Sequence, residues 1–270
     1  MKFSKSNRLF HYINRMKFLI NCDLGEVDHV SKLENDKIFL RYINMANIAC
    51  GGHAGSDEVM IEILKYCKRL DVLPGAHPSY PDRQNFGRTT LPATTDDIRR
   101  WTFEQVQRIN DHATRSEIAI HHIKPHGALY HDTMNGLNIA EAFILGVLDA
   151  NKSWKSNTAK IPNVEQSNPS TIHIVGQSGS KLEQVCIREG LPFLSEAFAD
   201  RKYLPSGALQ SRTIPGSVLN PEEALIQVKS MMSNGTVDST NGPIPIKFDT
   251  ICVHGDSPDA LSILESISKL

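Results

Sequence analysis

The sequence predicts an α/β protein built as one (β/α) barrel with parallel strands. Two observations lead to this prediction. Seven short apolar segments alternate with longer segments that carry apolar residues at helical spacing. Polar and ionisable residues follow nearly every short segment. A closed barrel brings the carboxyl ends of all its strands to one mouth, whereas an open sheet binds ligands at a single switch point. The pattern therefore favours a closed or nearly closed barrel.

The short apolar segments are the expected strands. They are residues 18–24, 45–49, 72–76, 119–123, 171–175, 193–198 and 250–253. In the first of them Asn21 and Asp23 are two residues apart and share a face. If this face is the barrel interior, Asp23 lies at the mouth as a base or a ligand. The alternative is a carboxylate that bonds the backbone N–H groups of the following turn.

Amphipathic segments between the strands are the expected helices. They are residues 57–70, 95–113, 138–148, 221–232 and 258–270. The first has acidic residues in its first turn, which favours a helix start. The fourth has Asn220 as a cap and Pro221 at its first helical position.

Two segments fall outside this alternation. Residues 151–170 are rich in Asn, Ser, Lys and Pro, which predicts a flexible surface insertion. Residues 1–15 predict a disordered N-terminal extension, with an organelle-targeting leader as the alternative. We therefore expect a single barrel domain over residues 16–270.

Composition excludes several classes of function. The chain has 29 Lys and Arg against 30 Asp and Glu, so it has no broad basic field for nucleic acid. No apolar segment reaches membrane-spanning length, so we expect no membrane association. Five cysteines without a CxxC pair favour a reducing compartment, the cytoplasm. The sequence has no P-loop, Rossmann, GxSxG or HExxH motif.

The candidate site residues stand at the ends of the expected strands. His53 and His77 follow adjacent strands. Each could donate to a substrate carboxylate or bind a metal, although a lone histidine is more often structural. In HHIKPHGALY, His122, Lys124 and His126 share a face. The lysine suits an oxyanion or phosphate and His126 suits acid–base chemistry.

The last two clusters come late in the chain. Asp200 and Arg201 are neighbours, and they form either a local ion pair or a site in which Arg201 binds a carboxylate or phosphate. His254 and Asp256 share one face at the last strand. A histidine oriented by an aspartate is a common acid–base arrangement.

Eight motifs occur along the chain in the order found in one known family. They are NCDLGE (21–26), ANIACGGHAG (46–55), GAHPSYPD (75–82), FGR (86–88), KPHGALY (124–130), FADRKY (198–203), PGSV (215–218) and ICVHGD (251–256). On these motifs the sequence resembles the LamB/YcsF family, the A subunits of 5-oxoprolinase, over nearly the whole chain from Met16.

The resemblance implies a distorted seven-stranded TIM-like barrel of the glycoside hydrolase/deacetylase type. It also implies ATP-dependent opening of 5-oxo-L-proline to L-glutamate, with partner subunits B and C that bind and use the ATP. A partner would phosphorylate the lactam oxygen, and this chain would direct water onto the activated ring. Asp23 or the His254–Asp256 pair would be the base, and Lys124, His126 and Arg201 would hold the phosphate and the developing anion. We expect the remaining substrate contacts from Asn21, His53, His77 and Asp200.

The sequence departs from the family pattern at several positions. Leu19 replaces the usual Asp, which we expect to remove one carboxylate from the site. Gly52 replaces Phe, Ser56 replaces Asp, and Ser79 replaces Gly. Two other functions stay open at this point. One is a metal-dependent, deacetylase-like amidohydrolase with Asp23, His53 and His77 as ligands. The other is a non-catalytic barrel that binds a small molecule.

Overall fold

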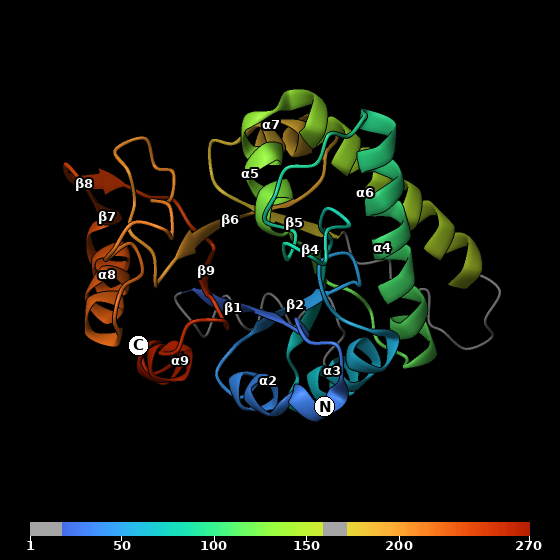
Figure 1. Ribbon diagram of the computed structural model, residues 1–270, viewed down its shortest axis with the longest axis horizontal. Helices are drawn as coiled ribbons and strands as arrows, with labels where there is room; N and C mark the ends of the chain where they lie inside the picture. The colour runs from blue at the N-terminus through green and yellow to red at the C-terminus, as the bar shows by residue number, and fades with distance from the viewer. Residues whose placement is uncertain (1–17, 159–171) are drawn as a thin grey trace.

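Seven parallel strands form a closed barrel in the computed structural model, which describes residues 18–158 and 172–270 (Figure 1). The strands are β1 (Leu19–Leu24), β2 (Met45–Ala49), β3 (Leu73–His77), β4 (His122–Ile123), β5 (His173–Gly176), β6 (Phe193–Phe198) and β9 (Thr250–Val253). The barrel closes where β9 pairs with β6 on one side and with β1 on the other. The predicted seven-stranded barrel is confirmed.

The predicted strand 119–123 is longer than the observed β4. Pro74 of β3, which lies beside this segment, has no N–H to donate, and Pro125 comes two residues after the end of β4. Only His122 and Ile123 form ladder pairs with β3. β4 is therefore a strand of only two residues.

Helices surround the barrel (Figure 1). They are α2 (Glu34–Phe39), α3 (Asp57–Leu70), α4 (Thr95–Arg115), α5 (Gly127–Asn135), α6 (Leu137–Thr158), α7 (Lys181–Arg188), α8 (Pro221–Asn234) and α9 (Ala260–Ile267), with a short 3-10 turn, η1 (Val30–Lys32). Asn220 caps α8 in a capping box with Glu223, as its sequence predicts. None of the helices in the described residues has the length and apolar character needed to cross a membrane.

Two features of the fold differ from the sequence prediction. Helix α6 continues to Thr158, so the first part of the expected flexible insertion 151–170 is helical. Its polar residues, which suggested a loop, continue a helix whose Ala150 is fully buried. The rest of that insertion, residues 159–170, lies outside the described residues, as does the expected extension 1–15. An antiparallel hairpin, β7 (Thr236–Ser239) and β8 (Gly242–Pro245), follows α8 and was not predicted.

The amino-terminal end of the barrel interior is apolar. Leu19, Met45, Val175 and Leu194 form a buried cluster there. Asn21 and Asp23 follow Leu19 on the same face of β1 and lie progressively nearer the mouth. Leu19 packs among aliphatic side chains below the polar layers, so its position lies beneath the mouth.

Candidate active site at the barrel mouth

A layer of neutral polar side chains lies above the apolar cluster. Asn21 Nδ2 donates to Thr250 Oγ1 at 2.9 Å, and Asn47 Nδ2 donates to Asn21 Oδ1 at 2.8 Å. His122 Nε2 donates to Asn47 Oδ1 at 2.8 Å, and burial holds the pKa of His122 well below its usual value. A Cβ at Gly75 would lie 2.2 Å from His122 Nε2, so only glycine leaves room for this ring.

Lys124 lies at the centre of the next layer. Its Nζ is 3.0 Å from Asp23 Oδ1, 2.8 Å from Glu196 Oε1 and 3.2 Å from Cys252 Sγ. Burial opposes the charge of Lys124, but Asp23, Cys252 and Glu196 outweigh it and raise the pKa of the lysine well above its usual value. The ammonium group is therefore a fixed charge held between carboxylates.

Asp23 is the carboxylate that this layer presents to the mouth. Burial would raise the pKa of Asp23, but His77 and Lys124 outweigh it and hold the pKa well below its usual value. Asn47 Nδ2 also donates to Asp23 Oδ1 at 2.7 Å. These contacts keep the carboxylate ionised and fix its position.

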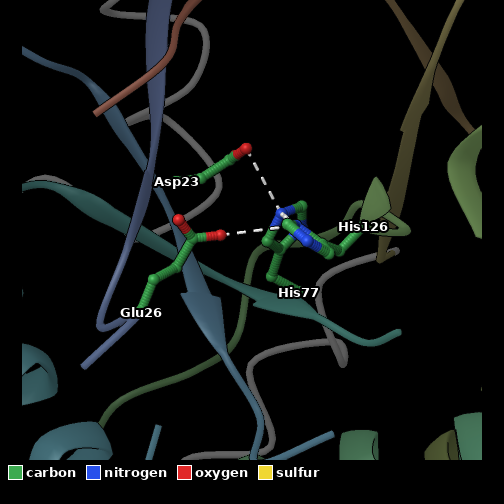
Figure 2. A group of neighbouring side chains, drawn as sticks. All are labelled: Asp23, Glu26, His77 and His126. Atoms are coloured by element: carbon green, nitrogen blue, oxygen red, sulfur yellow. Dashed lines mark hydrogen bonds and ion pairs between the residues drawn. The ribbon is translucent and has the colours of Figure 1, made fainter. Parts of the chain in front are cut away.

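Asp23, Glu26, His77 and His126 form a compact group at the mouth, with one ligand-type atom of each within 4.8 Å of the others (Figure 2). His77 Nε2 is 3.3 Å from Asp23 Oδ2, and His126 Nδ1 is 3.3 Å from Glu26 Oε1. The two ring nitrogens, His77 Nε2 and His126 Nδ1, are 3.0 Å apart. Burial raises the pKa of Glu26 and lowers the pKa of His126.

His53 supports this group from behind. Its ring stacks on His126 with the ring centroids 3.7 Å apart, and its Nε2 lies 3.2 Å from Glu26 Oε1. The side chains whose ligand-type atoms converge at the mouth are therefore not the expected set of Asp23, His53 and His77. Glu26 and His126 take the place of His53, because Glu26 follows β1 by two residues and turns back over the mouth.

His254 has a carboxylate partner, but not the expected one. Its Nδ1 lies 2.9 Å from Asp200 Oδ1, and its ring stacks on Phe198. Asp256 instead accepts from Arg88 Nη2 at 2.5 Å and from Arg212 Nη1 at 2.7 Å. The expected His254–Asp256 pair is therefore wrong, because the Asp256 carboxylate pairs instead with two arginines from other loops.

Arg201 and Asp200 do not form the local ion pair considered from the sequence. Arg201 is buried and its Nη2 donates to the backbone oxygen of Gln210 at 2.6 Å. Asp200 points to His254. Arg201 thus braces the loop that carries Arg212, and the arginines in contact with a carboxylate at the mouth are Arg88 and Arg212.

A separate hollow lies on the outer surface, away from this mouth. Its lining includes Lys65, Lys68, Arg69 and Arg115, and it is open to solvent. Lys65 and Lys68 already pair with Glu62 and Glu117. The hollow has neither the buried histidines nor the carboxylates of the mouth, so we place the active site at the mouth.

Comparison with known proteins identifies the family. The model of the LamB/YcsF family matches residues 19–270. The chain belongs to the LamB/YcsF family. Its sequence is 37% identical to the A subunit of 5-oxoprolinase from Pyrococcus abyssi, over 94% of each chain. It is 38% identical to that of Thermococcus sibiricus, over 94% of this chain and 93% of the relative.

A solved structure agrees with this assignment. The lactam utilization protein from Thermus thermophilus is similar to this LamB/YcsF protein with a TM-score of 0.80 and 29% sequence identity. The match covers 94% of this chain and 95% of that one. The expected family and fold are confirmed over nearly the full length.

Two departures of this LamB/YcsF protein lie against each other. A Cβ at Gly52 would be 2.5 Å from Ser79 Oγ and 2.3 Å from Gln105 Oε1. Gln105 Nε2 in turn donates to the Ser79 backbone oxygen at 2.7 Å. The side chains of Ser79 and Gln105 therefore occupy the space that a side chain at position 52 would need.

Sequence reasoning missed Arg88 and Arg212 at the mouth of this LamB/YcsF site and three further residues. These three are Glu26, Asn47 and Glu196. A signal existed for two of them, since Asn47 is the single polar residue of β2 and Glu196 the single ionisable residue of β6, and an unpartnered polar group inside an apolar strand is costly. Glu26 stood in the quoted NCDLGE motif, but its turn back toward His126 depends on the loop after β1.

Proposed function

We propose that this chain is the A subunit of an ATP-dependent 5-oxoprolinase and opens the activated lactam ring of 5-oxo-L-proline to give L-glutamate. The observation that carries the proposal is the near full-length identity of 36–38% to relatives named as the A subunit of 5-oxoprolinase. The similarity to a lactam utilization protein supports it. The mouth of the barrel, with its buried carboxylates and histidines, is the place where this chemistry fits.

The proposal divides the reaction between different chains. A five-membered lactam is a poor electrophile, so its carbonyl needs activation before water can open the ring. Partner subunits B and C would bind ATP and phosphorylate the lactam oxygen, because this sequence has no nucleotide-binding motif. This chain would receive the activated species, in the cytoplasm, where its five buried free thiols are stable.

His254 is the residue we assign as general base. Asp200 holds its Nδ1 at 2.9 Å, which leaves Nε2 to take the proton of the attacking water. Asp23 is a weaker candidate, because His77 and Lys124 keep its pKa low. We assign it instead to orienting water and substrate together with Asn21, His53, His77 and His126.

Arg88 and Arg212 would bind the anionic part of the substrate. Both contact Asp256 Oδ2, and both are partly exposed at the mouth. A substrate carboxylate or phosphoryl group can replace Asp256 as their partner at similar distance. Arg201 supports Arg212 through the loop that it braces. Lys124 acts through Asp23, because its charge is already paired inside the barrel.

Reconstitution tests this function. Glutamate and ADP are measured with the purified chain alone, with candidate B and C subunits alone, and with all of them together. We expect glutamate only from the full set, and loss of glutamate when the chain carries His254→Asn. Substitution of His112, which bonds Asp57 on the outer helices, is the matched control and keeps glutamate formation. ATP-dependent glutamate release by the lone chain contradicts the division of labour, and an inactive full set of cognate subunits contradicts the function.

A further inference from the structure

The hydrogen bonds of His77 and His126 determine which ring nitrogens carry protons. His77 Nδ1 lies 2.8 Å from the backbone oxygen of Lys124, and His126 Nε2 lies 3.0 Å from the backbone oxygen of Phe86. A carbonyl oxygen only accepts, so both of these nitrogens are N–H donors. In neutral rings, His77 Nε2 and His126 Nδ1 must therefore present lone pairs.

These two lone pairs face each other and two carboxylates. His77 Nε2 and His126 Nδ1 are 3.0 Å apart, and neither can donate to the other in the neutral form. Asp23 Oδ2 and Glu26 Oε1 approach the same point and also only accept when ionised (Figure 2). Four acceptors thus converge without a donor among them, which is an arrangement that a cation stabilises.

The spacing matches the spacing of ligands around one ion. Two ligands bonded at about 2.1 Å are about 3.0 Å apart at a right angle and about 3.4 Å apart at the tetrahedral angle. The three closest contacts of the group are 3.0, 3.3 and 3.3 Å. Three of the six ligand-atom pairs therefore already have this spacing, and all four ligand atoms lie within 4.8 Å of one another.

The neighbours of the group are those that metal ligands usually have. Ligating histidines commonly donate their second N–H to a backbone carbonyl, which fixes the tautomer and the ring plane. His77 and His126 both do so. Lys124 and Asn47 hold Asp23, and His53 holds Glu26. The group therefore has an outer layer of partners as well as four ligand atoms.

We propose that Asp23, Glu26, His77 and His126 bind one divalent transition-metal ion, and that Zn²⁺ fits this set of two nitrogens and two oxygens best. Imidazole favours zinc and similar ions over magnesium, whereas an all-oxygen site would favour magnesium or calcium. A bound ion of this kind acts as a Lewis acid and lowers the pKa of bound water. The two carboxylates are the more exposed members, so water and substrate reach the ion from their side.

Calorimetric titration of the lone, chelator-treated chain tests the site. The titrants are Zn²⁺, Mn²⁺ and Mg²⁺, each alone. We expect saturable binding of one Zn²⁺ per chain, with Mg²⁺ binding far more weakly. Absence of saturable Zn²⁺ binding by the folded chain overturns the proposal and assigns the four acceptors to a shared proton. No lactam, ATP or partner enters this experiment, so its result is independent of the proposed function.

Variants show whether the ion is in this group. Glu26→Gln and His126→Asn each remove one ligand with little change in shape, and we expect Zn²⁺ affinity to fall by more than about 100-fold, beyond the range typical of outer-shell changes. His112→Asn removes a histidine that bonds Asp57 at 2.7 Å and is outside this group, and it should leave affinity unchanged. Equal affinity in all three variants overturns the assignment.

A measurement on the wild-type chain tests the proposal even if the variants fail to fold. Co²⁺ in place of Zn²⁺ should give the visible absorption of an ion with nitrogen and oxygen protein ligands, and added Zn²⁺ should abolish it. A spectrum that stays that of hydrated Co²⁺ contradicts the proposal. Zn²⁺ should also raise the thermal midpoint of the wild-type chain, because it binds only the folded state.

Discussion

Lys124 and Glu196 face each other inside the barrel, with Nζ and Oε1 2.8 Å apart and both side chains almost fully buried. Lys124 is also the partner of Asp23 at the mouth, at 3.0 Å. The charge of the candidate active site is thus balanced from below by a residue that no substrate touches. This relationship determines what substitution of the lysine does.

Lys124→Met should destabilise the chain by about 3–5 kcal/mol, the scale for removing one partner of a buried ion pair. The variant leaves Glu196 and Asp23 without their shared cation. Lys124→Met combined with Glu196→Gln should recover part of the loss, because the second change removes the unpaired charge. Urea unfolding of the wild type, of Lys124→Met, of Glu196→Gln and of the double variant measures these effects. A double variant no more stable than Lys124→Met shows that the pair is not coupled.

Asp200→Asn should lower turnover of the reconstituted enzyme by about 10²–10⁴ with little change in KM, because Asp200 sets the orientation and tautomer of His254. Asp256→Asn should change kcat much less. The comparison separates the observed partner of His254 from the one expected from sequence. Equal losses of kcat in the two variants contradict the assignment of Asp200 as the orienting residue.

Arg212→Met should raise KM by about 10- to 100-fold, the range for loss of one charge-assisted hydrogen bond. Arg212 contacts Asp256 at the mouth and is only partly exposed. Arg188→Met is the control, because Arg188 pairs with Glu141 and Glu189 on the outer surface. Steady-state kinetics of the assembled enzyme distinguish them, and an unchanged KM in Arg212→Met removes Arg212 from substrate binding.

His121 should make stability fall in acid. Burial, with a contribution from His173, lowers the pKa of His121 to about 3, whereas an unfolded histidine titrates near 6.5. Between these values the unfolded chain binds the extra proton, so stability is full above about pH 6.5 and is lost as pH falls toward 3. The contribution is at most about 1.4 kcal/mol per pH unit.

His121→Phe should flatten this part of the stability profile, because phenylalanine keeps a ring against His173 and does not titrate. The free energy of unfolding is measured in urea from pH 7 to pH 4. His29→Gln, a change at an exposed histidine, should keep the wild-type slope. A His121→Phe profile that follows the wild type over this range excludes the residue as the cause.

The barrel was predictable because the signals for its strands lie within short stretches of the sequence. Strands such as Met45–Ala49 and Thr250–Val253 have the expected bounds, since turn residues limit short apolar segments on both sides. The short β4 was not predictable in the same way, because its length depends on which residues pair with the neighbouring strand β3. The hairpin after α8 was missed because Pro243 and Pro245 argue against a strand.

The sequence predicted where the candidate site lies, but not which of its side chains contact one another. Strand-end placement correctly brought His77, Lys124 and His126 together, because parallel strands share one carboxyl edge. Which carboxylate holds His254 depends on loops: Asp256 follows the same strand, but Arg88 and Arg212 reach it from other parts of the chain. Sequence spacing contains no information on such long-range competition.

The pairing of β1 with β9 has a consequence for how the chain folds during its synthesis on the ribosome. Asn21 donates to Thr250, a residue synthesised 229 positions later, and the mouth needs both Asp23 and His254. A growing chain can form α3, α4 and several neighbouring strands early, yet it has no closed barrel until residues 250–253 have emerged. Until then the open edge of β1 is exposed to chaperones and to other nascent chains. Catalytic competence is therefore acquired as one of the last events of translation, and a ribosome that stalls before β9 releases a product without a site.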